Sequence, residues 1–299
     1  MDLPPGVSGK RVIITGATNG IGLAAAKALA GAGADLAIIA RSPERATAAV
    51  AEIEGARRGG KPVDVLLADL SSQAEVRRVA AEIRARYPRI DVLVNNAGAM
   101  FTRRQLSVDG IEMTWAVNHL APFLLTTLLL DRLKASAPAR VVTTASDAHT
   151  GATVPFDDLN ADRGYKGFRR YGESKLANIL FTAELARRLA GTGVTANCVH
   201  PGLVATGFNY NNGPLMAAAM RIVGVFSRSP ENGAETLVWL AVAPEVAGTT
   251  GGYFVDKQRR APSVAGQSVD AARRLWEASQ RQVAATGTAA PRPMPRLVK

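Results

Sequence analysis

Short apolar runs alternate along the chain with longer segments in which apolar and polar residues mix. The first apolar runs are RVIIT (11–15), DLAIIA (35–40) and VDVLLADL (63–70), each of a length typical of a buried strand. They are separated by alanine-rich segments of helical length, beginning with IGLAAAKALAGAG (21–33). Strands that are apolar throughout and alternate with helices are typical of a parallel sheet covered on both faces. The pattern therefore predicts an α/β domain built on such a sheet.

The same alternation extends through the second half of the chain. Because crossovers between parallel strands are right-handed, a doubly wound sheet within a single domain is the expected outcome. Further strands are predicted at 91–98, 140–146 and 194–202, with a last strand at 251–256, and helices at 43–58, at 74–87, in a long apolar segment through Leu133, and around Tyr171.

Small, polar or charged residues follow six of the predicted strands. In open parallel sheets, ligands bind beyond the carboxyl ends of the strands. Because these ends meet at one edge of the sheet, we expect a single site built from six loops. The residues at that edge are TGATNGIG (15–22), Arg41, Asp69, NNAG (95–98), Ser146 and HPG (200–202).

The net charge of +11 first suggests a nucleic-acid or membrane partner, but its distribution argues otherwise. From Lys257 onward, nine Lys/Arg and two Asp/Glu give 9 − 2 = +7, which leaves 11 − 7 = +4 for the rest of the chain. Residues 285–299 are rich in Ala, Pro and Arg without periodicity, so we expect a disordered basic tail after a domain at 1–284. A binder of single-stranded nucleic acid would interleave aromatic residues there. No aromatic residue follows Trp276, so no nucleic-acid partner is predicted.

The numbers of cysteines and histidines argue against a disulfide-stabilised protein and against a metal-binding protein. The one cysteine, Cys198, cannot form an intramolecular disulfide and indicates a reducing compartment. With three histidines and no cluster of metal-ligand residues, no metal site is predicted. The first ten residues lack the apolar stretch of a signal peptide, and the run at 120–130 is too short to span a bilayer. The expectation is a cytoplasmic protein without a membrane anchor.

The glycine-rich stretch after the first strand is a candidate phosphate loop. Gly16, Gly20 and Gly22 let the backbone approach a pyrophosphate at a helix N-terminus, where N–H groups and the helix dipole favour anions. A plain glycine turn is the alternative. After the second strand, Ala40 stands where an acidic residue would bind the ribose of NAD, and Arg41 follows it. This favours NADP(H) over NAD(H), unless Arg41 stacks on the adenine or faces solvent.

The stretch YGESK places Tyr171 and Lys175 one helical turn apart on the same face. A cation about 4 Å from the phenol contributes ~4 kcal/mol at an effective dielectric near 20. This could lower the phenol's pKa of about 10 by up to about three units, less the cost of burial. We therefore expect Tyr171 to act as a general acid/base near neutral pH. Ser146 would bond the substrate's oxygen, or else cap a strand end, and His149 and His200 are expected to make local hydrogen bonds.

With these residues in place, the chain resembles the short-chain dehydrogenases/reductases from Gly9 to about Gln282, a family with a Rossmann-type doubly wound sheet. The resemblance implies a catalytic set of Asn118, Ser146, Tyr171 and Lys175. The cofactor-binding residues that it implies are Gly16, Thr18, Asn19, Gly20, Ile21, Gly22, Arg41, Asp69, Leu70, Asn95, Ala97, Gly98, Tyr171, Lys175, Pro201, Gly202, Val204 and Thr206.

Four segments are similar to the retinol dehydrogenase-like branch, to which the light-dependent protochlorophyllide reductases are related: NHLAPFLLTTLLL (118–130), SDAH (146–149), SKLANILFTAELARRL (174–189) and ARRLWEAS (272–279). The resemblance implies a substrate lid at 207–230, whose composition suits an apolar ketone, aldehyde or alcohol. The surplus of apolar residues on the helix around Tyr171 suggests a homodimer. The membrane-anchoring N-terminus of many animal relatives is not seen, which argues against retinoid processing at a membrane.

Pro122 lies four residues after Asn118. Proline has no N–H to give the Asn118 carbonyl and its ring clashes there, so the helix should kink. The resemblance places Asn118 at the family's proton-relay position, where a water in relatives links to the active-site lysine. We therefore predict that the freed Asn118 carbonyl binds a water that extends a proton path from Tyr171 through the ribose and Lys175. The alternative is a kink that serves packing alone.

The function predicted from these residues is an NADP(H)-dependent oxidoreductase with Tyr171 as general acid/base. It would interconvert an apolar ketone or aldehyde and its alcohol by hydride transfer. The alternative is a catalytically silent NADP-binding sensor or scaffold on the same fold. Such a protein should have lost Tyr171 or Lys175, and both are present.

Overall fold

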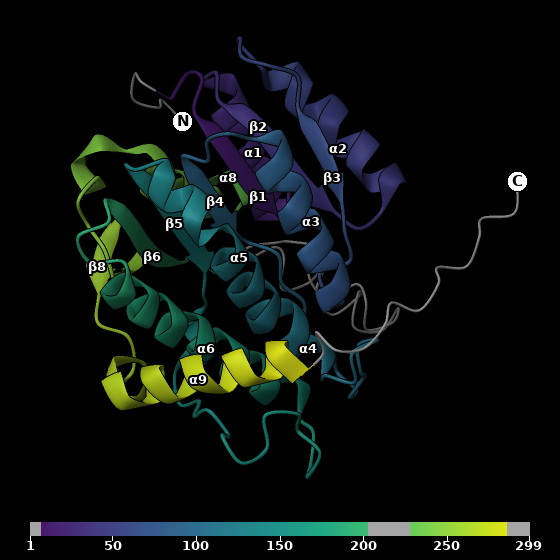
Figure 1. Cartoon of the computed structure of the whole chain (residues 1–299), viewed down its shortest axis with the longest axis vertical. Coiled ribbons are helices and arrows are strands. Elements are labelled where there is room, and N and C mark those ends of the chain that lie inside the picture. Colours follow the sequence, from purple (N-terminus) through teal and green to yellow (C-terminus); the bar gives the residue numbers. More distant parts are fainter. Residues whose placement is uncertain (1–6, 203–227, 286–299) are drawn as a thin grey trace, which may run out of the picture.

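A single eight-stranded sheet runs through the protein, in the order β3-β2-β1-β4-β5-β6-β7-β8 (Figure 1). This computed structural model describes residues 7–202 and 228–285. The strands are β1 (Arg11–Thr15), β2 (Asp35–Ala40), β3 (Asp64–Leu67), β4 (Val92–Asn95), β5 (Ala139–Thr144), β6 (Val194–His200), β7 (Tyr253–Val255) and β8 (Gln258–Arg260).

The strand order confirms the predicted doubly wound topology. The chain builds outward from β1 through β2 to β3, then returns to place β4 on the other side of β1. All neighbours from β3 to β7 are parallel. The prediction of 251–256 as the last strand is wrong, because the antiparallel β8 follows it after a turn at Asp256 and Lys257. The polar sequence of β8, QRR, carries no apolar signal from which a strand could be predicted.

Helices cover both faces of the sheet, as the apolar strands require (Figure 1). Alternate residues of β1 belong to different cores: Ile13 packs into one buried cluster, while Val12 and Ile14 pack into the other. The first cluster lies under α3 (Gln73–Arg86), α5 (Ala121–Ala135) and α6 (Gly167–Arg188), and the second under α1 (Gly20–Gly31), α2 (Pro43–Ala56) and α8 (Pro230–Val242). The short 3-10 helices are η2 (Asp147–His149), η4 (Pro244–Val246) and η5 (Val264–Gln267).

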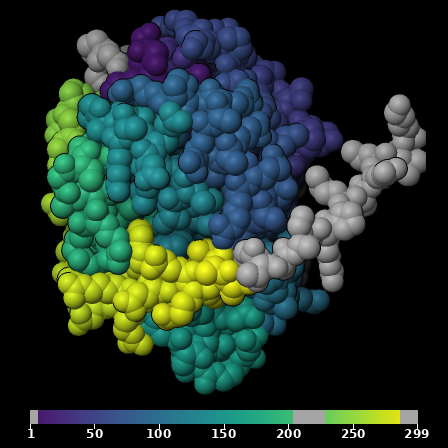
Figure 2. Space-filling view, viewed as in Figure 1, coloured from purple at the N-terminus to yellow at the C-terminus, as the bar shows by residue number. Residues whose placement is uncertain are grey.

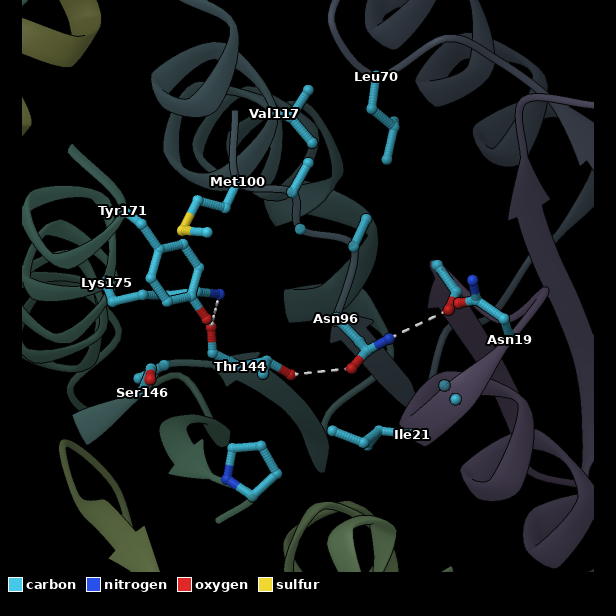
Figure 3. Close-up of a pocket in the computed structure, with 18 of the residues that line it drawn as sticks. Asn19, Ile21, Leu70, Asn96, Met100, Val117, Thr144, Ser146, Tyr171 and Lys175 are labelled. Carbon is cyan, nitrogen blue, oxygen red and sulfur yellow. Dashed lines mark hydrogen bonds between the residues drawn. The ribbon is translucent and has the colours of Figure 1, made fainter. Parts of the chain in front are cut away.

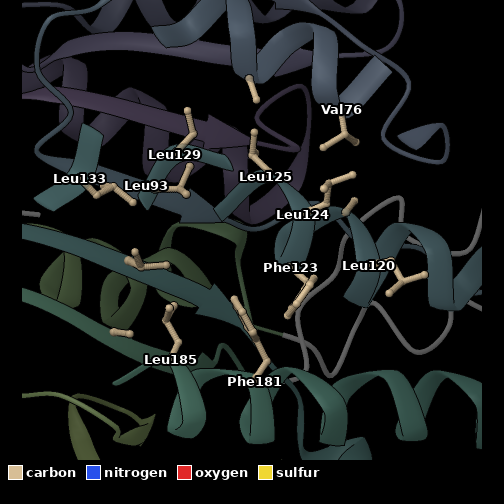
Figure 4. Packing of buried hydrophobic residues seen from close by; sticks show 14 of the residues in the cluster. Val76, Leu93, Leu120, Phe123, Leu124, Leu125, Leu129, Leu133, Phe181 and Leu185 are labelled. Carbon is tan, nitrogen blue, oxygen red and sulfur yellow. The ribbon is translucent and has the colours of Figure 1, made fainter. Parts of the chain in front are cut away.

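The long apolar segment forms one helix of three parts: α4 (Met113–Trp115), a π-helical turn η1 (Ala116–Leu120), and α5. Within residues 7–202 and 228–285 it is the one helix long and apolar enough to cross a membrane. Of the most apolar stretch of this helix, a share of 72% is buried inside the fold. Leu124, Leu125 and Leu129 pack there with Val76 of α3 and Leu93 of β4 (Figure 4). The apolar surface of this helix is therefore buried in the core, as predicted.

The last described helix, α9 (Val269–Ala285), lies across α6 (Figures 1 and 2). Trp276 stacks on Phe181 at a centroid distance of 6.0 Å, and Leu275 and Val283 join the same buried cluster. This corrects the basis of the homodimer prediction: the surplus apolar residues of α6 are covered by the chain's own helix. A homodimer stays a prediction, without that support.

Candidate functional site

A cavity of about 1340 Å³ lies at the carboxyl ends of the strands (Figure 3). All six of the predicted strand-end loops contribute to its lining, so the prediction of one site from six loops agrees with the structure. The predicted residues that line it are Gly16, Thr18, Asn19, Gly20, Ile21, Gly22, Arg41, Asp69, Leu70, Ala97, Gly98, Ser146, Tyr171, Lys175, Pro201 and Gly202. Val204, Thr206 and most of the predicted lid at 207–230 lie outside the described residues.

The glycine loop is held in a shape that only glycine permits. Gly16 has a φ of +69°, and α1 begins at Gly20 with a φ of +51°. A Cβ on Gly22 would lie 2.1 Å from the Gly16 carbonyl oxygen. The loop therefore lies close against the first turn of α1, and it presents backbone to the cavity at a helix N-terminus. This arrangement suits a phosphate group.

Asn96, which the sequence analysis did not select, fastens the glycine loop to its neighbours. Its Nδ2 donates to the carbonyl oxygens of Thr15 at 3.3 Å and Gly16 at 3.2 Å, and its Oδ1 accepts from Thr144 Oγ1 at 3.2 Å (Figure 3). The neighbouring Asn95, which was predicted to bind the cofactor, does not line the cavity. Its amide donates to Thr126 Oγ1 of α5 at 2.9 Å instead. Successive strand residues face opposite ways, so only one of the two asparagines can reach the loop.

Two arginines line the far end of the cavity, beyond β2. Arg41 follows the strand, and Arg45 lies in the first turn of α2, where Ser42 caps the helix by accepting the Arg45 N–H at 3.2 Å. Asp69 also lines the cavity, but its Oδ1 is occupied by the N–H and hydroxyl of Ser71, both at 2.9 Å. This end can therefore receive an anionic group, and Arg45 is a contributor that the sequence analysis missed.

Tyr171 and Lys175 face the cavity from the first turns of α6, as their spacing predicted (Figure 3). Lys175 Nζ donates to the Thr144 carbonyl at 3.0 Å and lies 5.5 Å from the centre of the Tyr171 ring. Ser146 completes the group, because interaction of its hydroxyl with Tyr171 lowers the pKa of the phenol. The same hydroxyl accepts the Ala148 N–H at 3.2 Å and so caps η2. Both roles considered for Ser146, oxygen partner and cap, are therefore open to it.

The proton affinities of the pair differ from the expectation. Burial raises the pKa of Tyr171 to about 12, and the bond with Ser146 opposes that rise. Burial also lowers the pKa of Lys175 to about 8. The prediction that Lys175 brings the phenol's pKa near neutral is wrong for this structure, because desolvation favours the neutral form of the phenol. At pH 7 Tyr171 therefore holds its proton, and Lys175 is mostly charged.

Both histidines near Ser146 make local hydrogen bonds, as expected. His149 Nδ1 donates to the Ser146 carbonyl at 2.7 Å, and its Nε2 accepts the Ser263 N–H at 3.1 Å. His200 lines the cavity, its Nδ1 accepts the Asp147 N–H at 3.3 Å, and burial lowers its pKa. These bonds fix the backbone around Ser146.

The Asn118 side chain is turned away from the cavity and fully buried. Its Oδ1 accepts the Ala99 N–H at 2.7 Å, and its Nδ2 donates to the Ala99 carbonyl and to Ser174 Oγ, both at 2.9 Å. It therefore ties the loop after β4 to the catalytic helix, a role that the sequence analysis did not foresee.

The helix backbone at Asn118 departs from regular α-helix, as the position of Pro122 predicted. The Ala121 N–H reaches back five residues to the Ala116 carbonyl, in a π-helical turn directly before Pro122. A missing N–H at Pro122 is a sufficient reason for the change of register. The water relay through the Asn118 carbonyl stays a prediction.

The wall opposite the glycine loop is apolar. It is lined by Met100, Phe101, Met113, Val117 and Phe168, and Figure 3 shows Met100 beside Tyr171 and Val117 between Met100 and Leu70. Within residues 7–202 and 228–285, no group of three or more His, Cys, Asp and Glu residues could hold a metal ion.

Comparison with known proteins gives a consistent result. A family model described as short chain dehydrogenase matches residues 10–214. The chain is 45% identical over 284 residues to DnrU of Streptomyces sp. (strain C5), provisionally assigned as a daunorubicin C-13 ketoreductase; 94% of this chain and 95% of that protein are covered. It is 41% identical over 300 residues to retinol dehydrogenase 13 of Homo sapiens, covering 97% and 89%.

A solved structure with NADP bound is also similar. It is a short chain dehydrogenase from Burkholderia cenocepacia J2315 in complex with NADP, with a TM-score of 0.64 and 31% identity, covering 87% of this chain and 98% of that one.

Proposed function

Because the chain belongs to the short-chain dehydrogenase/reductase family and is an oxidoreductase acting on CH–OH groups, we propose that it reduces an apolar ketone or aldehyde with NADPH. The observation that carries this proposal is the protonated Tyr171 beside Ser146 and Lys175, in one cavity with the glycine loop.

The residues of this chain divide the work of carbonyl reduction between them. NADPH, when bound, supplies the hydride. The Ser146 hydroxyl donates a hydrogen bond to the carbonyl oxygen, whose negative charge grows as the hydride arrives. Tyr171 gives its proton to the same oxygen. Its raised pKa keeps the acid in its donating form across the neutral range.

Lys175 has a separate part in this scheme. Its ammonium is held by the Thr144 carbonyl. In this proposal it binds the ribose hydroxyls of the cofactor and stabilises the tyrosinate left after proton transfer. The Asn118 carbonyl, through a water, would return the proton.

The choice of NADP(H) over NAD(H) rests on the two arginines beyond β2. Arg41 and Arg45 line the end of the cavity where an adenosine 2′-phosphate would lie. Guanidinium groups bind phosphate through charge-assisted, often bidentate hydrogen bonds. The similar structure from Burkholderia cenocepacia holds NADP.

The substrate class rests on the apolar wall and on the relatives' names. Met100, Phe101, Val117 and Phe168 offer an adaptable surface without charge. A ketoreductase and a retinol dehydrogenase both interconvert a carbonyl and an alcohol. We further propose that 207–230 covers the bound substrate, that 285–299 is a tail outside the catalytic domain, and that the protein acts in the cytoplasm.

A screen of ketones, aldehydes and secondary alcohols tests this function, with consumption of NADPH or NADH as the readout. We expect turnover of apolar carbonyls with NADPH and a marked preference over NADH. Tight NADPH binding without turnover of any compound would contradict the proposal and support the alternative of a silent sensor.

A further inference from the structure

A buried ion cluster lies behind the apolar wall of the cavity. Arg170, the residue before Tyr171, is 1% exposed. Its Nε donates to Glu112 Oε2 at 2.7 Å and one terminal nitrogen donates to Glu173 Oε2 at 3.2 Å, while the other binds the Leu159 carbonyl. The guanidinium also lies over the Trp115 ring, 4.5 Å from its centre. Each of the three guanidinium nitrogens of Arg170 thus has a hydrogen-bond partner, and the side chain is closed to solvent.

Glu112 connects the cluster to the helix that carries part of the wall. Its carboxylate is 0% exposed and accepts the N–H groups of Thr114 and Trp115, both at 2.9 Å, at the start of α4. Met113 and Val117 project into the cavity from this helix. The position of Glu112 therefore sets where that part of the wall begins.

Tyr165 connects the cluster to a second part of the wall. Its hydroxyl donates to the Phe101 carbonyl at 2.7 Å and lies 3.3 Å from Glu112 Oε1. Gly167 is pressed against the same carbonyl, since a Cβ there would lie 2.3 Å from the Phe101 oxygen. The segment that leads into α6 is thus clamped on Phe101, which lines the cavity.

We propose that Arg170, with Glu112 and Tyr165, is a positioning residue: it sets the spacing between the Phe101 segment and the start of α6, and so fixes the carbonyl substrate opposite Tyr171. This inference rests on the proposed reductase function. A buried ion pair contributes little net stability compared with apolar packing, but its geometry is directional. Through Glu112 and Tyr165 these bonds reach two segments of the substrate wall, at the start of α4 and at Phe101. None of the bonds described above reaches the glycine loop or the arginines beyond β2.

The neighbouring arginine provides a matched control. Arg169 also binds Glu173, through Oε1 at 2.8 Å, but its side chain is 67% exposed. Arg170→Met and Arg169→Met therefore remove the same charge from adjacent residues that share a partner. Tyr165→Phe is a milder variant that deletes the hydroxyl's bonds to the Phe101 carbonyl and to Glu112 but leaves the ion pairs of Arg170 in place.

Steady-state kinetics of the three variants should separate the two halves of the cavity. For Arg170→Met and Tyr165→Phe we expect the KM of the carbonyl substrate to rise about tenfold or more, because small misplacements in a site are costly. The Kd of NADPH should stay within about twofold, and Arg169→Met should leave both constants unchanged. Equal weakening of NADPH and carbonyl binding would overturn the proposal, since it would indicate a general loss of structure.

Amide hydrogen exchange tests the proposal without relying on turnover. In Arg170→Met and Tyr165→Phe, the amides of residues 98–103 should exchange faster than in the wild type, and in Arg169→Met they should not. Unchanged exchange in both variants would overturn the inference. If the wild type turns over no carbonyl, the proposed function fails, but exchange still decides whether the cluster holds the Phe101 segment. If Arg170→Met does not fold, Tyr165→Phe carries both measurements.

Discussion

The two halves of the cavity are built in different ways. The half beneath β1, β2 and β4 is made of glycines, backbone atoms and side chains that directly follow their strands, such as Arg41 and Asn96. The half around Tyr171 depends on side chains brought together across long stretches of sequence, such as Arg170 and Glu112, 58 residues apart. The half built from backbone should lose its function when a side chain is added to one of its glycines. The half built from side chains should lose its function when one of those side chains is removed.

The largest effect is expected at the centre of the side-chain-built half. Tyr171→Phe removes only the phenol oxygen and should lower kcat by about 10²–10⁴, the usual range for an acid–base group. NADPH affinity, measured by fluorescence titration, should be nearly unchanged because the phenol acts on the proton. Retention of more than about a tenth of the rate would show that another group donates the proton.

The backbone-built half should fail on addition of one methyl group. In Gly22→Ala the new Cβ would lie 2.1 Å from the Gly16 carbonyl oxygen and 2.5 Å from Asn96 Nδ2, so the loop must move. Overpacking of about 1–3 kcal/mol, if it falls on cofactor binding, corresponds to a rise in the Kd of NADPH of roughly five- to 150-fold.

Gly55→Ala is the matched control, because Gly55 lies within α2 and a Cβ there meets nothing within 4 Å. Its Kd should match that of the wild type. An equal change in both variants would mean that helix propensity, and not the contact with the glycine loop, is responsible.

Charge selectivity in the same half should depend on Arg41. Arg41→Asp removes a charge-assisted bond of about 1.5–3 kcal/mol and adds repulsion toward the 2′-phosphate. We expect NADPH to bind at least about tenfold more weakly and NADH to be relatively favoured, as measured by kcat/KM for each cofactor. An unchanged ratio of kcat/KM for NADPH and NADH would contradict the role of Arg41 and point to Arg45 as the residue that selects NADPH.

The pH dependence of cofactor binding should come from Lys175, where the two halves meet. Its pKa is lowered to about 8 by burial, so the ammonium is present below that pH and is lost as the pH rises through it. The Kd of NADPH should therefore rise above pH 8, with a limiting slope of about tenfold per pH unit if only the charged form binds.

Lys175→Arg provides the comparison, because a guanidinium keeps its proton over this range. Its NADPH affinity should be weaker at pH 7 but flat from pH 7 to 9. A rise of the same size in the variant would assign the titration to another group.

The smallest effect is expected outside both halves. Deletion of residues after Ala285 should leave activity and Tm within error, because the sequence there has no apolar periodicity with which to bury a face. Loss of several degrees in thermal unfolding would show that the segment docks on the domain or on a partner.

The same division explains how far the sequence could be interpreted. The seven parallel strands β1 to β7, the glycine loop and the spacing of Tyr171 and Lys175 were predictable because each depends on neighbours in the chain. The choice of Asn96 over Asn95 was not, because it depends on which face of β4 each side chain takes.

The rest of the site depends on tertiary packing. Nothing in the local sequence of Arg170 distinguishes it from Arg169, yet one is buried and the other exposed. The raised pKa of Tyr171 follows from burial, which two residues at helical spacing do not encode. The apolar excess of α6 had two physical solutions, a partner subunit or a later helix, and only the fold shows that α9 covers it.

The position of α9 also imposes an order on biosynthesis. Its anchors lie far back in the chain: the Trp115 indole bonds Gln282 Oε1 across 167 residues, and Gln73 reaches the Gln282 carbonyl across 209. While the ribosome is still translating α9, Phe181 and the flank of the helix that bears Tyr171 have no cover. The sheet and the glycine loop of the nascent chain can therefore form before α9 is available to cover the helix that bears Tyr171. A product cut short before Val269 would carry every described catalytic residue and still display an aromatic patch around Phe181, the kind of surface by which chaperones and proteases recognise unfinished proteins.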